Sequence, residues 1–334
     1  MTGLGVTANS VAVIGAGAFG TALALAFRRA GRDVTLWGRD HARMARWAET
    51  RDAGDTLPGI ILDPAIQITA DLASASAAPV VVVAVPTQSL GEVAAAMAAY
   101  VRDDAAILSA AKGIDRQNGF FVTEILAAVL GAQRFGVLSG PSFAQDIARG
   151  LPTAISLAMP EADEAEGLAQ YLSSPSLRLY HTADVRGVEI GGAAKNVLAI
   201  AAGIVSGMGL GESAHAAMIA RGFAELRRYA AVFGARTETL MGLSGLGDLV
   251  LTASSTQSRN YSLGLALGQG KAPAEANPTG KLAEGAFTAS ILARSARERG
   301  IEMPIVEAVA GVLDRTISVK EAVAALMTRP LRGE

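Results

Sequence analysis

The hydrophobic pattern of the chain changes about halfway along. In the first part, short apolar runs alternate with amphipathic stretches of helical spacing. A continuous apolar run of this length is typical of a parallel strand that is covered on both faces. Such runs predict strands at 11–14, 34–37, 80–85, 106–109, 135–138, 153–158 and 177–181, with a charged helix at 161–172 before the last of them.

From about residue 185 the strand-type runs stop and helical patterns dominate. Helices are expected at 214–233, 237–242, 284–299, 304–313 and 319–327. A chain of 334 residues is long for one core and comfortable for two domains. The change of pattern therefore predicts an α/β N-terminal domain with a mostly parallel sheet over residues 1–185, followed by an all-α C-terminal domain over residues 186–334.

A glycine motif follows the first predicted strand. Gly15, Gly17 and Gly20 form G-x-G-x-x-G between this strand and a helical pattern. The first glycine makes the tight turn, the second lets a pyrophosphate approach the backbone, and the third lets helix and strand pack closely. In this context the motif predicts a dinucleotide-binding Rossmann-type domain.

The end of the second predicted strand bears on the choice of cofactor. An NAD-specific site usually places an acid there to bind the ribose diol, whereas this chain has Arg39, which suits a 2′-phosphate. Asp40 next to it is an alternative partner for the diol, and Arg39 is alternatively a solvated loop residue. We expect NADP or NAD as cofactor, with NADPH preferred.

The stretch 187–209 is apolar, rich in Ala and Gly, and carries one cation, Lys195. Its apolar positions fall near helical spacing and predict a buried helix. A lysine in such a helix faces a large desolvation cost unless it has a partner or a task, although it can also extend from a helix end to water. A buried lysine can release and regain a proton, which arginine cannot.

Three further clusters are candidates for chemistry. Lys112 follows a predicted strand, at the sheet edge where ligands of such sheets bind, but is alternatively a loop lysine. Asp248 lies in a glycine-rich apolar stretch, where a carboxylate is uncommon without a cationic partner. Ser258, Arg259 and Asn260 offer donors for a phosphate, or alternatively a helix start capped by Ser258.

Composition excludes several classes of function. The net charge of −2 gives no reason to expect nucleic acid as a partner. The chain has no cysteine, and His41, His181 and His215 show no metal-ligand spacing, so we expect no metal. Neither a secretory signal nor a membrane span is expected, which favours a cytoplasmic protein. The apolar helical part makes a homodimer plausible.

These pieces suggest one chemistry. A nicotinamide moves hydride, so the protein must supply or remove the proton of the carbonyl being reduced. Lys195, with Asp248 nearby to orient its ammonium, is a better candidate than His181. Such acid–base assistance contributes about 10²–10⁴ in rate.

The motifs GAGAFGTALA, AAKGI, LSGPSFAQDIARGLPTA, GVEIGGAAKNVLAIAAGI, GLSGLGDLVLT and SRN occur in an order that resembles the NAD(P)-dependent glycerol-3-phosphate dehydrogenases, of the bacterial biosynthetic type. The resemblance runs from about Val11 to Pro304. It implies reversible reduction of dihydroxyacetone phosphate to sn-glycerol 3-phosphate, which feeds glycerophospholipid synthesis. Two departures are Gly91, where the family commonly has Arg, and Gln257, where Thr is more usual.

The resemblance also implies residue roles. Lys195 resembles the family's proton donor and acceptor, and Lys112 resembles the lysine that touches both cofactor and substrate. Asp248 and Thr252 resemble the pair that orders the catalytic lysine and the substrate. The candidate site comprises catalytic Lys195, Asp248, Lys112 and Thr252; substrate-binding Lys112, Gly140, Ser142, Lys195, Asn196, Asp248, Ser258, Arg259 and Asn260; and cofactor-binding Gly15, Gly17, Ala18, Phe19, Gly20, Arg39, Lys112, Ala144, Arg259 and Glu284.

Two rival interpretations remain open at this point. A related dehydrogenase that reduces a 2-keto or 3-hydroxy acid would use Arg259 as a carboxylate clamp, although Lys112 and the SRN set favour a dianion. A non-catalytic NAD(P)-binding sensor would not need Lys195.

Overall fold

The computed structural model describes residues 9–276 and 283–329. It separates into two compact units, each considered by itself below. The first contains the chain up to Asp115 and Phe120–Glu189, and the second contains Arg116–Gly119 and the chain from Ile190 on. The division at 189/190 lies inside helix α8 (Val185–Gly207), near the boundary expected from the sequence, whereas the assignment of 116–119 to the second unit had no sequence signal.

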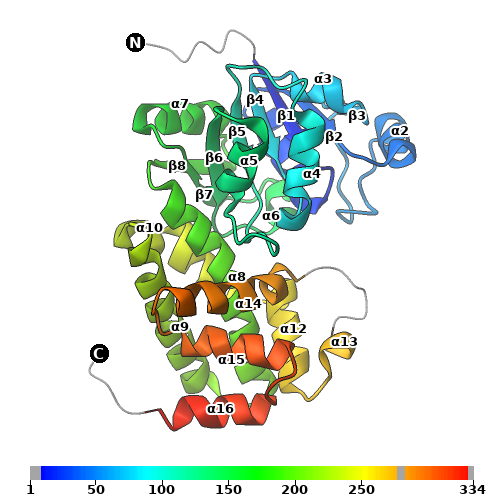
Figure 1. Cartoon of the computed structure of the whole chain (residues 1–334). Coiled ribbons are helices and arrows are strands. Elements are labelled where there is room, and N and C mark those ends of the chain that lie inside the picture. Colours follow the sequence, from blue (N-terminus) through cyan, green and yellow to red (C-terminus); the bar gives the residue numbers. More distant parts are fainter. Residues whose placement is uncertain (1–8, 277–282, 330–334) are drawn as a thin grey trace. The chain divides into compact units, whose positions relative to one another are not determined.

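The first unit is built on one eight-stranded sheet with the order β3-β2-β1-β4-β5-β6-β7-β8 (Figure 1). Neighbouring strands are parallel except β6 and β7, which pair antiparallel. The mostly parallel sheet and the helical second part confirm the predicted fold class. The strands are β1 (Ser10–Ile14), β2 (Asp33–Trp37), β3 (Gln67–Thr69), β4 (Val80–Val83), β5 (Ala106–Ser109), β6 (Arg134–Ser139), β7 (Thr153–Ala158) and β8 (Leu177–Thr182).

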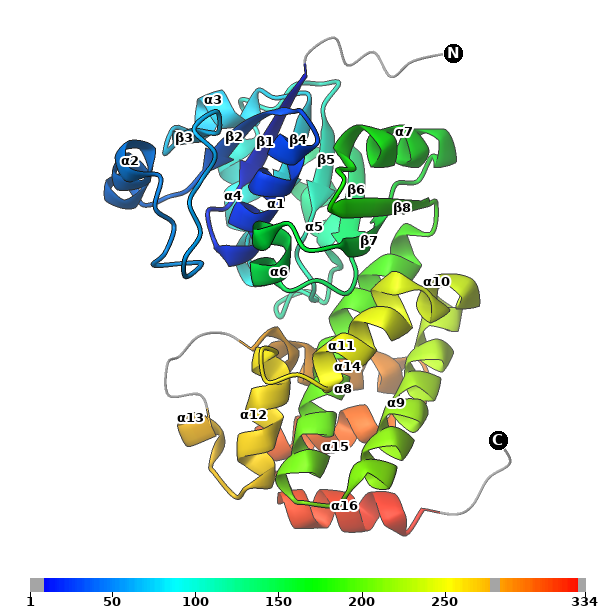
Figure 2. The ribbon, with the colours of Figure 1, turned by 180° about the vertical axis from the view of Figure 1, so that it is seen from behind.

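The central strands are apolar throughout because both sheet faces are covered. In β4, Val80 and Val82 join the core beneath α1 (Ala18–Arg29) and α6 (Ala144–Arg149). Val81 and Val83 join the core beneath α4 (Thr87–Met97) and α5 (Val122–Leu130). Figures 1 and 2 show the two helix pairs on opposite faces. The helices of this unit are α1 (Ala18–Arg29), α2 (His41–Thr50), α3 (Leu72–Ser76), α4 (Thr87–Met97), α5 (Val122–Leu130), α6 (Ala144–Arg149) and α7 (Ala162–Leu172).

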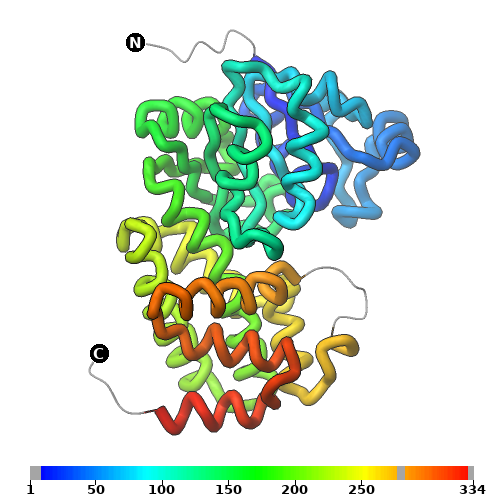
Figure 3. Tube along the Cα trace, viewed as in Figure 1, coloured from blue at the N-terminus to red at the C-terminus, as the bar shows by residue number. Residues whose placement is uncertain are grey.

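The second unit contains no strand among its described residues, and Figure 3 traces its chain through successive helices. After α8 come α9 (Glu212–Val232), α10 (Thr237–Met241), the π-helix η1 (Leu243–Gly247), α11 (Asp248–Ala253), α12 (Arg259–Gly268), α13 (Pro273–Ala276), α14 (Glu284–Glu298), α15 (Pro304–Leu313) and α16 (Val319–Met327).

Helix α8 is the buried helix predicted around Lys195. Among the described residues it alone is long and apolar enough to cross a membrane, and 94% of its most apolar window is buried inside the structure. It packs directly on α12. A Cβ at Gly203 would overlap the carbonyl oxygen of Tyr261, and one at Gly264 would overlap that of Ile200. These glycines let the two backbones touch, which fixes how α12 lies on α8.

Candidate active site

The glycine turn of the first unit has the geometry that a pyrophosphate requires. Gly15 has a φ of +125°, and a Cβ on it would lie 2.5 Å from the carbonyl oxygen of Ala84. A Cβ at Gly20 would overlap the carbonyl oxygen of Gly15, so helix and turn pack without a side chain between them. By contrast, a Cβ at Gly17 would meet nothing within 4 Å. The open space beside the N-terminus of α1 therefore fits a dinucleotide phosphate.

Two charged residues, Arg39 and Asp40, follow the end of β2, and only Asp40 has a capping contact. Arg39 is exposed. The carboxylate of Asp40 accepts a hydrogen bond of 3.0 Å from the backbone N–H of Arg43 and caps α2. This backbone hydrogen bond holds the pKa of Asp40 below its ordinary value. The residue that could have bound a ribose diol is thus engaged in helix capping, whereas Arg39 beside it is exposed.

Lys112, Gly140 and Ser142 come together at the carboxyl edge of the sheet. The amine of Lys112 donates to the carbonyl oxygen of Gly140 at 2.9 Å and lies 5.6 Å from the centre of the Phe19 ring. The hydroxyl of Ser142 donates to the same carbonyl at 2.9 Å. A Cβ on Gly140 would lie 2.8 Å from Cα of Ile155, which explains glycine at this position. The predicted lysine and SGPS turn therefore form one cluster.

In the second unit, Lys195 lies in a buried ion pair. Its amine donates to Oδ1 of Asp248 at 2.6 Å and to the hydroxyl of Thr252 at 2.9 Å. Lys195 is 6% exposed, Asp248 1% and Thr252 5%. Burial penalises the ammonium and the carboxylate alike, so each depends on the other for stabilisation. The lysine does not extend to water, and the snorkelling interpretation is wrong.

Close backbone packing places these two groups. A Cβ on Gly191 would lie 2.8 Å from the carbonyl oxygen of Ser244, so α8 and η1 approach without an intervening side chain. Lys195 lies one helical turn after Gly191, and Asp248 lies four residues after Ser244. The π-helix ends at Gly247, and Asp248 opens α11 with Thr252 one turn later. The contact between the backbones therefore brings the amine to the carboxylate.

The SRN motif opens α12. Ser258 is the N-cap, because its hydroxyl accepts a hydrogen bond of 3.2 Å from the backbone N–H of Tyr261. Arg259 is exposed at the first helical position. The amide nitrogen of Asn260 donates to Oδ1 of Asn196 at 2.9 Å, and its oxygen accepts from the backbone N–H of Gly285 at 3.1 Å. Lys195 and Arg259 thus precede two asparagines that bind each other.

The other predicted cofactor positions lie at helix starts. Ala18 and Phe19 open α1 and are half-buried, Ala144 opens α6, and Glu284 opens α14. Sequence reasoning missed two glycines that allow close backbone contacts around the site, Gly191 in α8 and Gly285 in α14. A Cβ on Gly285 would lie 2.6 Å from the carbonyl oxygen of Asn196, and nothing in the sequence around it indicates so close a contact.

Across the two described ranges, no group of three or more His, Cys, Asp and Glu residues is arranged to hold a metal ion. The candidate chemistry described above uses lysine, carboxylate and hydroxyl groups, together with the open space beside the N-terminus of α1.

Comparison with known proteins agrees with this geometry. Residues 10–165 match the N-terminal domain and residues 184–324 the C-terminal domain of the family described as NAD-dependent glycerol-3-phosphate dehydrogenase. The chain is 53% identical over 327 residues to a Bradyrhizobium diazoefficiens protein named glycerol-3-phosphate dehydrogenase (NAD(P)+), covering 98% of each chain. It is 54% identical over 326 residues to one of the same name from Azorhizobium caulinodans, again covering 98% of each.

The crystal structure of glycerol-3-phosphate dehydrogenase from Coxiella burnetii superposes with a TM-score of 0.91 at 35% identity, and the match covers 96% of this chain and 99% of that one. Both domains of the family are matched in order and at nearly full length, and the glycine turn fits the nicotinamide cofactor that the relatives' name states. The chain belongs to the NAD(P)-dependent glycerol-3-phosphate dehydrogenase family of oxidoreductases.

Proposed function

We propose that this protein catalyses the reversible reduction of dihydroxyacetone phosphate to sn-glycerol 3-phosphate with NADPH or NADH. The observation that carries the proposal is the buried Lys195–Asp248 pair, joined through Asn196 and Asn260 to the helix that bears Arg259. In this proposal the first unit is the dinucleotide-binding domain and the second is the substrate-binding and catalytic domain.

Lys195 is the general acid of the reduction. When bound, the nicotinamide supplies hydride to the carbonyl carbon. The Lys195 ammonium gives its proton to the carbonyl oxygen, so the ketone becomes a hydroxyl and the amine is left neutral. Asp248 and the hydroxyl of Thr252 hold the amine in place and favour its return to the ammonium form by uptake of a proton from solvent. In the reverse direction the neutral amine accepts the hydroxyl proton.

The phosphate is bound at the N-terminus of α12. This ten-residue helix directs backbone N–H groups and the positive end of its dipole toward an anion. Arg259 adds a guanidinium that is exposed and makes no hydrogen bond or ion pair within the described parts of the chain. Because Ser258 and Asn260 are already engaged in capping and in the Asn196 contact, Arg259 contributes most of the grip on the dianion.

The first unit holds the cofactor in this scheme. The Gly15–Gly20 turn would hold the pyrophosphate of the cofactor, and Arg39 would hold the 2′-phosphate of NADPH. Lys112 carries a positive charge at the same sheet edge, where Gly140 and Phe19 fix its direction. Ser142 supplies a hydroxyl beside it.

A spectrophotometric assay of NADPH oxidation tests the proposal. We expect rapid oxidation with dihydroxyacetone phosphate, and little with ketopantoate or with unphosphorylated dihydroxyacetone. Replacement Arg259→Ala should raise the KM for the phosphorylated ketone and change the KM for NADPH much less. Equal activity with the keto acid, or an unchanged KM for the phosphate ester in Arg259→Ala, would contradict the assignment.

We further propose that the enzyme works in the cytoplasm, where its product supplies glycerophospholipid synthesis, and that it is a homodimer. Three exposed apolar side chains on α9, α10 and α11 support an interface between copies: Val232 at 56% exposure, Met241 at 51% and Val250 at 51%. Light scattering of the purified protein at micromolar concentration would measure the mass, and a monomer would contradict this part.

A further inference from the structure

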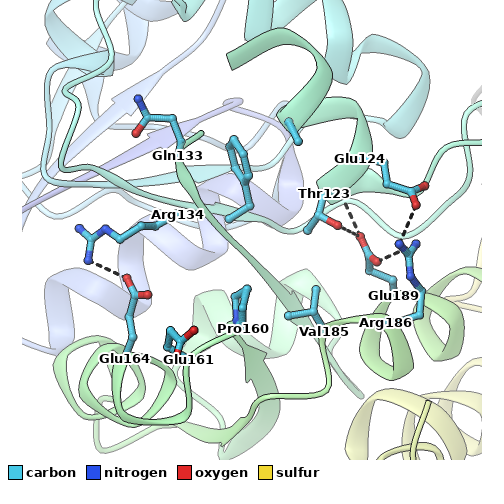
Figure 4. Close-up of a pocket in the computed structure, with 12 residues that line it drawn as sticks. Thr123, Glu124, Gln133, Arg134, Pro160, Glu161, Glu164, Val185, Arg186 and Glu189 are labelled. Carbon is cyan, nitrogen blue, oxygen red and sulfur yellow. Dashed lines mark hydrogen bonds and ion pairs between the residues drawn. The ribbon is translucent and has the colours of Figure 1, made fainter. Parts of the chain in front are cut away.

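Glu189 is a buried carboxylate that the proposed reaction does not use. It lies near the N-terminal end of α8, four residues after Val185, within the first unit, and is 5% exposed. Its Oε1 accepts hydrogen bonds from the backbone N–H of Thr123 at 2.9 Å and from the Thr123 hydroxyl at 2.8 Å. Its Oε2 lies 3.2 Å from the guanidinium of Arg186 (Figure 4). Burial raises the pKa of Glu189, and Arg186 acts against that shift.

These contacts cap a helix from outside. Phe121 occupies the N-cap position of α5 and forms no side-chain cap hydrogen bond. Glu189 therefore satisfies the N–H of Thr123, and Glu124 satisfies that of Phe121 at 2.8 Å. Arg186 joins the two carboxylates, with a 2.7 Å contact to Glu124, and its guanidinium stacks 4.2 Å from the centre of the Phe121 ring. Figure 4 shows the contacts among Thr123, Glu189, Arg186 and Glu124 at one side of a cavity of about 480 Å³.

The capped end of α5 also holds the segment that carries Lys112. Phe121 forms an isolated antiparallel bridge with Ile114, and the backbone N–H of Asp115 donates to the carbonyl oxygen of Phe120 at 2.9 Å. Ile114 lies only two residues after Lys112, and both Ile114 and Phe121 are buried. A shift of the first turn of α5 would therefore move the backbone next to Lys112.

We propose that Glu189 is a positioning residue, which holds the amine of Lys112 in its working place by fixing the start of α5. The inference rests on the proposed function, because the place of Lys112 matters only if Lys112 acts on cofactor and substrate. Glu189 and Arg186 also keep one end of α8 attached to α5, so the same carboxylate ties the lysine of this unit to the helix that continues to Lys195.

Kinetics of single and double variants test this. Glu189→Ala should lower kcat/KM for dihydroxyacetone phosphate by roughly 10- to 100-fold, the effect of a small misplacement of a reacting group. In a Lys112→Met background the same change should cost almost nothing further, because the group it positions is gone. Glu189→Gln keeps an oxygen for the Thr123 donors and should recover most of the activity.

Two more variants keep the test decisive. Thr123→Val serves as the test if Glu189→Ala does not fold. It removes one hydrogen-bond donor to Glu189 with little change of shape and should lower kcat/KM by about threefold to tenfold. Glu225→Ala is the matched control, since Glu225 is also a buried carboxylate that caps another helix, α15, and its loss should lower the melting temperature with kcat/KM close to wild type.

The outcomes separate the two proposals. Additive effects of Glu189→Ala and Lys112→Met, or full activity of both Glu189→Ala and Thr123→Val, would overturn this inference alone. An inactive wild-type enzyme would overturn the proposed function and this inference with it.

Discussion

Lys112 and Lys195 have the same side chain but contrasting surroundings in the two units. Lys112 is half-buried at the edge of the sheet and donates to a neutral backbone carbonyl. Lys195 is buried inside a helical unit and donates to a carboxylate and a hydroxyl. A half-buried ammonium keeps water nearby and stays charged, whereas a buried one depends on its partner for its protonation state. Under the proposed function, this contrast suits a charge contact by Lys112 and proton exchange by Lys195.

The largest loss of activity is expected from replacement of the buried lysine, Lys195. Lys195→Ala should lower kcat by about 10²–10⁴, because the proton donor is lost. The affinity for NADPH, measured by fluorescence titration, should remain that of the wild type, since the glycine turn is in the other unit. Substantial turnover in this variant would show that another group delivers the proton.

Charge-conserving replacements sharpen the comparison. Lys112→Arg should retain much more activity than Lys112→Met, whose loss we expect at roughly 10- to 100-fold, since a fixed positive charge is what the site needs. Lys195→Arg should be as inactive as Lys195→Ala, because guanidinium does not release its proton. Steady-state kinetics of the four variants test this prediction. Substantial activity of Lys195→Arg would show that the two lysines do not differ in role.

A third cation, Arg39, extends the comparison to an exposed side chain. Arg39→Ala should reduce the ratio of kcat/KM for NADPH to that for NADH by about tenfold, the value of one charged hydrogen-bonded contact with a 2′-phosphate. Asp40 remains as the cap of α2 in this variant, so the helix is expected to be retained. An unchanged ratio, or a wild-type preference for NADH, would remove Arg39 from the cofactor site.

The smallest predicted effect is a pH-dependent change in stability. It arises from a comparison of two buried carboxylates, Asp248 and Glu225. Asp248 has an ammonium at hydrogen-bond distance, whereas Glu225 accepts from the backbone N–H groups of Ile305 and Val306. Burial raises the pKa of Glu225 to about 7, even though these N–H groups and Arg228 act in the opposite direction; Glu307 adds to the rise.

Because the folded protein holds this proton more tightly than the unfolded chain, the contribution to stability is complete below pH ~4.5 and is lost as the pH rises through 7. The full change corresponds to about 3 kcal/mol at most. Glu225→Gln cannot titrate, so its melting temperature relative to wild type should rise between pH 5 and pH 8. A difference that does not change with pH would mean that Glu225 is charged throughout this range.

The sequence predicted elements well where burial is periodic or continuous. The run at 80–83 is a strand with both faces covered, and the helices at 304–313 and 319–327 begin and end where their patterns do. Strand β3 was missed, because its three residues are partly exposed and form no apolar run. The run 80–85 ends early as a strand, at Val83, because the chain turns there toward Pro86 and the start of α4.

The candidate site was predicted as far as side-chain chemistry allows. A lone lysine in an apolar helix and a lone carboxylate in a glycine-rich stretch each need a partner, and the structure pairs them across 53 positions of sequence. Ser258 acts as a helix cap, the alternative considered beside phosphate binding. Glu189 had no sequence signal, because a glutamate near the start of a helix is ordinary, and its partner Thr123 is 66 positions away.

The glycine contacts between α8 and α12 have a consequence for which positions of the enzyme can vary in sequence during evolution. A side chain at a helix crossing can switch rotamer, and the spacing of the helices then varies with it. At Gly203 and Gly264 main chain meets main chain, and there is no rotamer to switch. Backbone contact therefore fixes the distance from Lys195, the proposed proton donor, to Arg259, the proposed phosphate anchor. Substitutions on the outer faces of both helices should leave this distance unchanged.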